Sequence, residues 1–273
     1  MPELPEVETV RRSLAPRLTG DVIASVEVFF DGCVEGSTPE ELAWRLEGRR
    51  ILELVRRGKY LVFQLDDGAS LVIHLRMTGR LILIPADPVE LHPHTRVLFR
   101  FRSGKALRFD DQRKFGRVMW FRNSTSLKRR LALGVEPLDP AFTAARLGAL
   151  VKGRKRPIKS LLLDQKLIAG LGNIYADEAL FRARLLPWRP AGELSWQEVE
   201  ALCAAIRDVL AEGLKYKGTT LRDYVDGDGR TGMFQERLQV YGREGEPCPR
   251  CGGAVARVVL GGRSSFHCPR CQV

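Results

Sequence analysis

The sequence lacks an apolar run long enough to cross a membrane, and no long helical stretch pairs a basic face with exposed aromatic residues. We therefore expect no membrane partner. The first residues are acidic and contain proline, whereas a secretory signal is basic and then apolar, so we expect no signal and a cytoplasmic protein. Internal repeats and low-complexity segments are also absent, and the chain divides into a strand-rich half, a helical part and a cysteine-rich tail.

Acidic residues are outnumbered by basic ones. Asp and Glu number 33 against 44 Lys and Arg, which gives a formal net charge of +11 and an isoelectric point near 9.7. This excess favours a polyanionic partner without identifying it, and a merely soluble basic protein is the alternative. Cysteines are few, with six in 273 residues. In a reducing compartment they are more often thiols or metal ligands than disulfides.

Apolar periodicity predicts one N-terminal helix, then strands, then further helices. The first helix has apolar residues at helical spacing: Val7, Val10, Leu14 and Leu18. Eight short strand-like segments follow, at residues 21–30, 49–55, 59–65, 70–76, 80–84, 96–102, 105–109 and 117–121. That many short strands predicts a sandwich or flattened barrel. From about residue 134 the period is helical, most clearly in residues 195–218, where Ser195 and Glu198 form a capping box.

The tail contains the most specific local pattern. Two CPRC motifs supply Cys248, Cys251, Cys268 and Cys271, with sixteen residues between the pairs, a spacing suited to one tetrahedral structural zinc ion. Two disulfides or free thiols are the alternative. Between the pairs, Gly261 and Gly262 predict a hairpin turn that presents Arg263 near its tip. This arginine either is solvated or contacts nucleic acid.

The N-terminal stretch MPELPEVETV allows two interpretations. Pro2 and Pro5 suit the first turn of a helix, where their missing N–H would be unpaired, and the nearby glutamates complement the helix dipole. Alternatively, removal of the initiator methionine exposes the secondary amine of Pro2, which could act as a nucleophile. Taken alone, the residues favour the simple helix start.

Several other stretches permit both a structural and a DNA-binding interpretation. Residues 152–159 carry five basic side chains and no acid, and they precede the stretch IAGLGNIYADE. There Asn173 leads into a helix whose free amides could accept phosphate, or it simply caps that helix. A dinucleotide-binding fingerprint is rejected because Tyr175 stands at the third glycine position. Met77 and Phe115 lie in basic loops, and each taken singly is better explained by core packing than by wedging of DNA.

Seven motifs nevertheless occur in one order: MPELPEVET, RRGKYL, HLRMTG, DQRKFG, GLGNIYADE, FQERLQVYGREGEPC and the paired CPRC tail. In this the chain closely resembles the bacterial formamidopyrimidine-DNA glycosylases, which excise 8-oxoguanine and ring-opened purines. The resemblance implies an α+β protein of three domains. These are an antiparallel β-sandwich with an N-terminal helix (1–133), a helix-two-turn-helix domain (134–233) that includes a lesion-covering loop at about 218–233, and a zinc-finger β-hairpin (234–273).

The resemblance also implies residue roles. Pro2 would be the nucleophile and Glu3 the proton donor to the sugar. Lys59 and Arg263 would donate protons in the β,δ-eliminations of an AP lyase. Because an arginine is a poor acid, we expect Arg263 to act first as a phosphate clamp. Met77, Arg113 and Phe115 would fill the gap left by the extruded nucleotide. The remaining DNA contacts implied by the family are His94, Arg113, Arg154, Lys159 and Asn173.

The expected partner is duplex DNA holding oxidised purines or abasic sites, bound by a monomer at the bacterial nucleoid, with one structural Zn²⁺ as the cofactor. Two alternatives stay open. A glycosylase of the endonuclease VIII type would prefer oxidised pyrimidines, but its usual opening has glycine where this chain has Leu4. A non-enzymatic zinc-ribbon DNA-binding protein would explain the tail and the charge, but it would give the opening PELPE no purpose.

Overall fold

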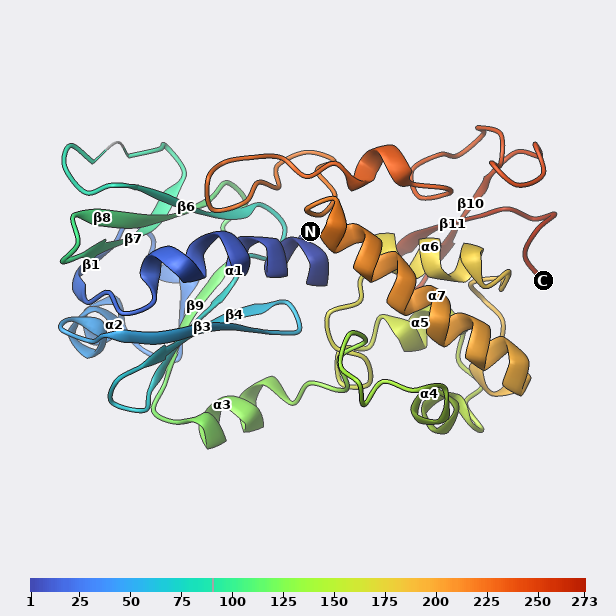
Figure 1. Cartoon of the computed structure of the whole chain (residues 1–273), viewed down its shortest axis with the longest axis horizontal. Coiled ribbons are helices and arrows are strands. Elements are labelled where there is room, and N and C mark those ends of the chain that lie inside the picture. The colour runs from blue at the N-terminus through green and yellow to red at the C-terminus, as the bar shows by residue number, and fades with distance from the viewer. Residues whose placement is uncertain (90) are drawn as a thin grey trace. The chain divides into compact units, whose positions relative to one another are not determined.

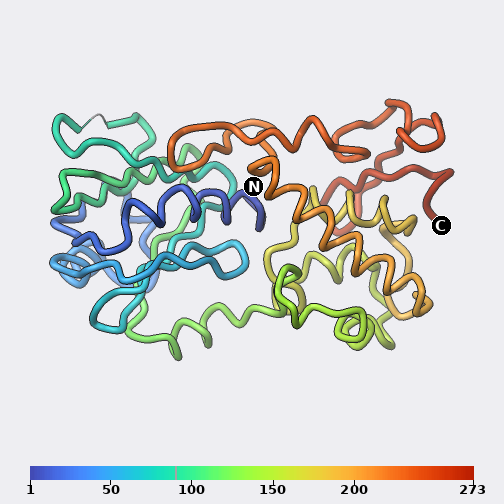
Figure 2. The backbone as a smooth tube through the Cα atoms, in the orientation of Figure 1, coloured from blue at the N-terminus to red at the C-terminus, as the bar shows by residue number. Residues whose placement is uncertain are grey.

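The computed structural model describes residues 1–89 and 91–273, which fold into two units (Figure 1). Unit 1 comprises Met1–Ala132 and Tyr216–Met233, and unit 2 comprises Leu133–Lys215 and Phe234–Val273. The segment Tyr216–Met233, orange in Figure 2, thus belongs to the N-terminal unit, whereas the sequence assigned residues 218–233 to the helical domain. Among the described residues, no helix is both long and apolar enough to span a membrane.

Unit 1 is a β-sandwich with one long helix. Its first sheet has the order β1-β7-β8-β6 and is antiparallel throughout, with strands at Ile23–Val28, Thr95–Phe101, Lys105–Asp111 and Gly79–Pro85. The second has the order β2-β9-β5-β4-β3, with strands at Val34–Glu35, Arg117–Phe121, Ser70–His74, Tyr60–Leu65 and Ile51–Arg57. Apolar side chains from both sheets form one core cluster, which also takes in residues of helix α1 (Leu4–Leu18).

The predicted strands are confirmed, because the alternating apolar residues and the turn residues of the sequence match the strands and turns of the structure. Each of the eight predicted segments contains a strand, and Gly68 and Gly104 have φ of +80° and +79° in the turns expected for them. The four apolar residues predicted for the first helix are each at most 1% exposed. Burial of this stripe against β3 holds α1 on the unit.

Three short elements of unit 1 were not predicted. These are strand β2, helix α2 (Pro39–Leu46) and helix α3 (Ser124–Leu131). Helix α2 does have a local signature, because Thr38 accepts a hydrogen bond from the Glu41 amide at 3.2 Å and Pro39 occupies the first turn. Strand β2 has only two residues and pairs in parallel with β9, so the sandwich is antiparallel except at this edge.

Unit 2 contains the helices α4 (Ala144–Val151), α5 (Ile158–Leu162), α6 (Asn173–Arg182) and α7 (Trp196–Lys215). The predicted capping box of α7 is confirmed, because the Ser195 amide donates to the Glu198 carboxylate at 2.8 Å and the Glu198 amide donates to Ser195 Oγ at 3.3 Å. Strands β10 (Ala256–Leu260) and β11 (Arg263–His267) form the predicted hairpin. The α+β fold class, with a terminal β-hairpin, is therefore confirmed. Short 3₁₀ turns lie at Asp31–Cys33, Ala191–Glu193 and Phe234–Arg237.

Candidate active site and nucleic-acid interface

The structure distributes the predicted site residues over both units. Unit 1 holds Pro2, Glu3, Lys59, Met77, His94, Arg113 and Phe115, and unit 2 holds Arg154, Lys159, Asn173, Arg263 and the four tail cysteines.

The start of helix α1 places Pro2 and Glu3 in a buried position. Glu3 precedes the first helical residue, is 2% exposed, and donates its amide to Glu6 Oε2 at 2.7 Å. Pro5 lies in the first turn, so the expectation of a helix start is confirmed. A helix start at residue 4 is compatible with a reactive amine at Pro2, because that nitrogen makes no helical hydrogen bond.

The segment Tyr216–Met233 is attached to the same helix end. The Thr219 amide donates to the second oxygen of Glu6 at 2.7 Å, and the Tyr224 hydroxyl donates to backbone carbonyls at Lys217 and Glu6. Gly218 has φ of +84°, and a Cβ there would lie 2.8 Å from the Glu6 side chain. Glu6 therefore holds both the first turn of α1 and the segment predicted to cover the lesion.

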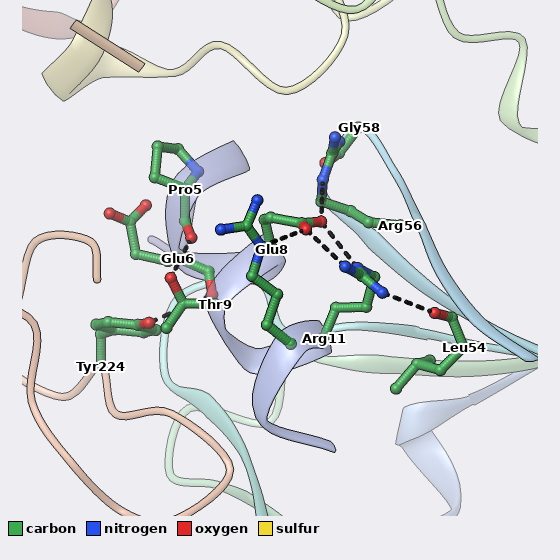
Figure 3. Close-up of polar contacts among 10 residues, drawn as sticks. Pro5, Glu6, Glu8, Thr9, Arg11, Leu54, Arg56, Gly58 and Tyr224 are labelled. Atoms are coloured by element: carbon green, nitrogen blue, oxygen red, sulfur yellow. Dashed lines mark hydrogen bonds and ion pairs between the residues drawn. The ribbon is translucent and has the colours of Figure 1, made fainter. Parts of the chain in front are cut away.

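Glu8, farther along the same helix, accepts hydrogen bonds from three arginines. Arg11 and Arg12 donate to it at 2.8 and 2.9 Å, and Arg56 of strand β3 donates at 3.3 Å (Figure 3). Burial raises the pKa of Glu8, but the hydrogen bonds and charges of these arginines outweigh burial, so its pKa is lowered overall. From the sequence alone, Glu8 is expected only to complement the helix dipole, and its arginine partners are not predicted.

The Glu8 cluster supports the turn that carries Lys59. Arg56 also donates to the carbonyl of Gly58 at 3.0 Å, and Lys59 is 5% exposed in the same turn. Next to it, burial together with the charges of Arg76 and Lys59 lowers the pKa of His74 to about 3. His74 is therefore neutral at physiological pH, and its Nδ1 accepts the Arg76 amide at 2.9 Å.

Met77 and Phe115 are exposed rather than packed in the core. Their exposed fractions are 40% and 46%, so the core interpretation of each is wrong. The guanidinium of Arg113 lies over the Phe115 ring, with its carbon 4.7 Å from the ring centre. Apolar tips that project from a basic surface have the chemistry of side chains that enter between bases.

Two residues that the sequence did not identify bring these turns together. Thr78 bonds Asp111 Oδ1 and accepts the Arg113 amide at 3.1 Å. Asp111, 1% exposed, also accepts the Gly116 amide at 2.7 Å, and its own amide donates to the carbonyl of His94 at 2.9 Å. The turn that contains Met77, the turn that contains Arg113 and Phe115, and the segment at His94 thus form one rigid surface.

In unit 2, Arg154 is exposed, but Lys159 is not. The Lys159 side chain is 1% exposed, and its ammonium lies 2.6 Å from Asp177 Oδ1 and 2.9 Å from the carbonyl oxygen of Ser264. Burial raises the pKa of Asp177, while the charge of Lys159 opposes that shift. The expectation that Lys159 touches DNA does not fit this enclosed ammonium, which instead holds the zinc-finger hairpin.

Asn173 is the first residue of helix α6, and Gly172 is the cap, so the helix-cap interpretation of Asn173 is wrong. Its Nδ2 donates to the carbonyl of Ser264 at 3.0 Å, which places it beside the hairpin. Arg263 begins strand β11 and is exposed, as the turn at Gly261 and Gly262 predicted; their φ values are +55° and +74°.

The four tail cysteines fit zinc and not disulfides. All four Sγ atoms lie within 4.8 Å of one another, and the separations Cys248–Cys271 and Cys251–Cys268 are 3.9 and 3.5 Å. A tetrahedral zinc with bonds of about 2.3 Å requires sulfur separations of about 3.8 Å, whereas a disulfide requires about 2.05 Å. The chain therefore has one structural zinc site, with no coordination position left for chemistry.

Comparisons with known proteins cover almost the whole chain. The formamidopyrimidine-DNA glycosylase N-terminal domain matches residues 1–118, the formamidopyrimidine-DNA glycosylase H2TH domain matches residues 133–225, and the zinc finger found in FPG and IleRS matches residues 245–273. The formamidopyrimidine-DNA glycosylase of Moorella thermoacetica is 53% identical over 94% of each chain.

Solved structures agree with these matches. The MutM (FPG) protein of Thermus thermophilus is 46% identical, with a TM-score of 0.89 over 99% of this chain and 98% of that chain. An FPG mutant of Lactococcus lactis in complex with DNA containing Fapy-dG is 36% identical, with a TM-score of 0.93 over 99% of both chains. The same Lactococcus protein has also been solved with DNA containing an abasic site.

Proposed function

Because the chain belongs to the formamidopyrimidine-DNA glycosylase family, we propose that it excises oxidised purines from duplex DNA and then cuts the strand at the abasic site. The substrates are 8-oxoguanine and formamidopyrimidines, and the proposed AP lyase activity extends beyond the glycosylase activity that the names of the relatives state. The protein acts as a monomer on chromosomal DNA in the bacterial cytoplasm.

The observation that carries this proposal is the buried pair Pro2 and Glu3 at the start of α1. Once methionine is removed, Pro2 offers a secondary amine. An α-amine titrates at about 8, so a useful fraction is unprotonated at neutral pH, whereas an ordinary lysine at about 10.4 would need a large shift. A carboxyl group on the adjacent residue supplies a proton donor within reach of the same sugar.

The proposed reaction begins with extrusion of the damaged nucleotide, which costs a few kcal/mol. Met77 and Phe115 fill the gap, and Arg113 addresses the base left without a partner. The Pro2 nitrogen forms a bond to C1′ of the sugar as the bond from C1′ to the base breaks, and the proton that the amine loses passes to the departing base. Glu3 protonates the ring oxygen as the ring opens. The product is an iminium ion on Pro2.

The iminium acidifies the adjacent carbon, so proton loss there expels the 3′ phosphate by β-elimination, and δ-elimination then expels the 5′ phosphate. Lys59 donates protons in these steps, and Arg263 stabilises the departing phosphate by charge-assisted hydrogen bonds. Arg154, Asn173 and His94 bind the DNA backbone, and residues 218–233 cover the extruded purine.

Borohydride trapping tests this proposal. We expect reduction to capture a covalent adduct with a duplex containing 8-oxoguanine opposite cytosine, and we expect no adduct when a tag blocks Pro2. An adduct with the tagged protein would refute the assignment of Pro2. A duplex with an oxidised pyrimidine serves as the control, because preferential trapping of that substrate would indicate endonuclease VIII-type specificity instead.

A further inference from the structure

A buried ion pair joins two helices of unit 2 to the hairpin that carries Arg263. Lys159 of α5 and Asp177 of α6 lie 2.6 Å apart, and their side chains are 1% and 0% exposed. The two residues belong to separate motifs of the sequence, and neither motif pattern indicates that they meet. A pair enclosed to this degree is held in one geometry, since water does not compete for its hydrogen bonds.

The same pair, together with Asn173, holds three consecutive residues of strand β11. The carbonyl of Ser264 accepts hydrogen bonds from Lys159 Nζ at 2.9 Å and from Asn173 Nδ2 at 3.0 Å. Lys159 also donates to Ser265 Oγ at 2.8 Å, and the Phe266 amide donates to Asp177 Oδ2 at 3.0 Å. This anchored run begins at the residue directly after Arg263.

Stability alone does not explain a charged pair at this place. Replacing a buried ion pair with apolar groups of similar volume is often neutral or stabilising, so the benefit of such a pair lies in the geometry that it specifies. The zinc site holds the far end of β11, next to Cys268, and the pairing with β10 fixes only one edge. The ion pair, together with Asn173, fixes the Arg263 end of the strand on the helices.

We propose that Asp177 is a positioning residue for Arg263. Through Lys159 and the Phe266 amide it fixes the start of β11, so that the guanidinium meets a DNA phosphate without reorganisation. This inference rests on the proposed function, because it assigns Arg263 to a phosphate. A displacement of about 1 Å in such a group can reduce a rate about 100-fold, so the anchor has a measurable consequence.

A double-mutant cycle tests the proposal by its effect on DNA affinity. The variants are Asp177→Asn, Arg263→Ala and the double variant, and the ligand is a duplex with a stable abasic-site analogue. Asp177→Asn keeps an oxygen for the Phe266 amide but removes the charge that fixes Lys159. We expect it to weaken binding at least about fivefold in the wild-type background and less than about twofold in the Arg263→Ala background. Equal losses in both backgrounds, or no loss in either, would overturn the proposal.

The matched control is Glu212→Gln. Glu212 pairs with Arg182 of the same helix α6 at 2.6 Å, but the two side chains are 31% and 22% exposed and the pair lies outside the contacts to β11. We expect this variant to bind DNA as the wild type does. Zinc content and melting temperature are measured for every variant, so that loss of the fold is distinguished from loss of positioning.

If Asp177→Asn does not fold, the pair is replaced by apolar groups in Lys159→Met/Asp177→Leu. We expect this variant to fold and keep zinc, yet to lose the Arg263-dependent part of DNA affinity; full affinity in a folded protein would contradict the proposal. Because the readout is binding, an enzyme that fails to trap 8-oxoguanine DNA would count against the proposed function and leave this test intact.

Discussion

The two units bury charge in different ways. In unit 1, Glu8 pairs with three arginines whose side chains are between 11% and 59% exposed. Water therefore still solvates part of the charge in this cluster. In unit 2, Lys159 and Asp177 form a single pair that is excluded from solvent. A cluster with several partners tolerates the loss of one, whereas a lone buried charge that loses its partner is strongly destabilising.

Each network supports a neighbouring group that the proposed reaction uses. The Glu8 cluster holds the turn of Lys59 through Arg56, and the Lys159–Asp177 pair holds the strand that begins with Arg263. The turn of Lys59 in unit 1 is thus supported by a cluster with several partners, whereas the start of the Arg263 strand in unit 2 depends on one buried pair.

Removal of zinc should have the largest effect, and it should be confined to unit 2. Structural zinc contributes folding energy directly, about 10–16 kcal/mol of binding in zinc-finger peptides. We expect a chelator to make the hairpin sensitive to protease while unit 1 stays resistant, with a loss of DNA affinity on the order of 100-fold or more. Proteolysis mapped by mass spectrometry measures this, and added zinc should restore the wild-type pattern. A hairpin that stays resistant without metal would contradict the assignment.

Breaking the buried pair should have the next largest effect. Lys159→Met leaves Asp177 buried without its partner, so the carboxyl group must either hold an uncompensated charge or take up a proton, and we expect a loss of about 3–5 kcal/mol in the free energy of unfolding. Replacing both partners, in Lys159→Met/Asp177→Leu, should recover most of that loss. Urea denaturation measures both variants. If Lys159→Met loses less than about 1 kcal/mol, the buried pair of unit 2 is no more sensitive to loss of a partner than the solvated cluster of unit 1.

The sequence predicts most of the fold because the strands follow local rules. Alternation, turn glycines and helical period place eight strands, helix α1 and helix α7, each of which depends on residues close in sequence. Helix α2 was missed although Thr38 and Glu41 mark its start. Its eight residues were too short to stand out among the surrounding strand patterns.

The site is less predictable because its supporting contacts are distant in sequence. The zinc ligands follow from spacing alone, and the assignments of Pro2 and Glu3 follow from the family resemblance. The supporting contacts of Asp111, Glu8 and Asp177 are not predicted, since each carboxylate bonds a segment that only the tertiary fold brings near. For the same reason Lys159 was expected on the surface: a basic run such as 152–159 does not reveal which of its members is buried.

Removing the charge of Glu8 should have a smaller effect than breaking the buried pair. Glu8→Gln keeps one oxygen for the arginines, and the arginines keep access to water, so we expect a loss of about 1–2 kcal/mol in the free energy of unfolding. Urea denaturation at neutral pH measures it. Glu41→Gln is the matched control, because Glu41 approaches Arg45 at 3.7 Å with its side chain 51% exposed, and it should cost less than about 0.5 kcal/mol.

The smallest expected effect is the pH dependence of that same loss. The arginines lower the pKa of Glu8 below its unfolded value of 4.5, so the folded state holds the carboxylate in preference to the acid. The resulting stability is fully present above pH 4.5 and is lost as the pH falls through the lowered value, where the folded protein also takes up the proton. The difference in unfolding free energy between wild type and Glu8→Gln should therefore be constant from about pH 7 to about pH 5 and shrink below about 4.5. A difference that persists unchanged to about pH 3 would mean that Glu8 contributes packing rather than charge, and the contrast between a partly solvated cluster and a buried pair would then no longer hold.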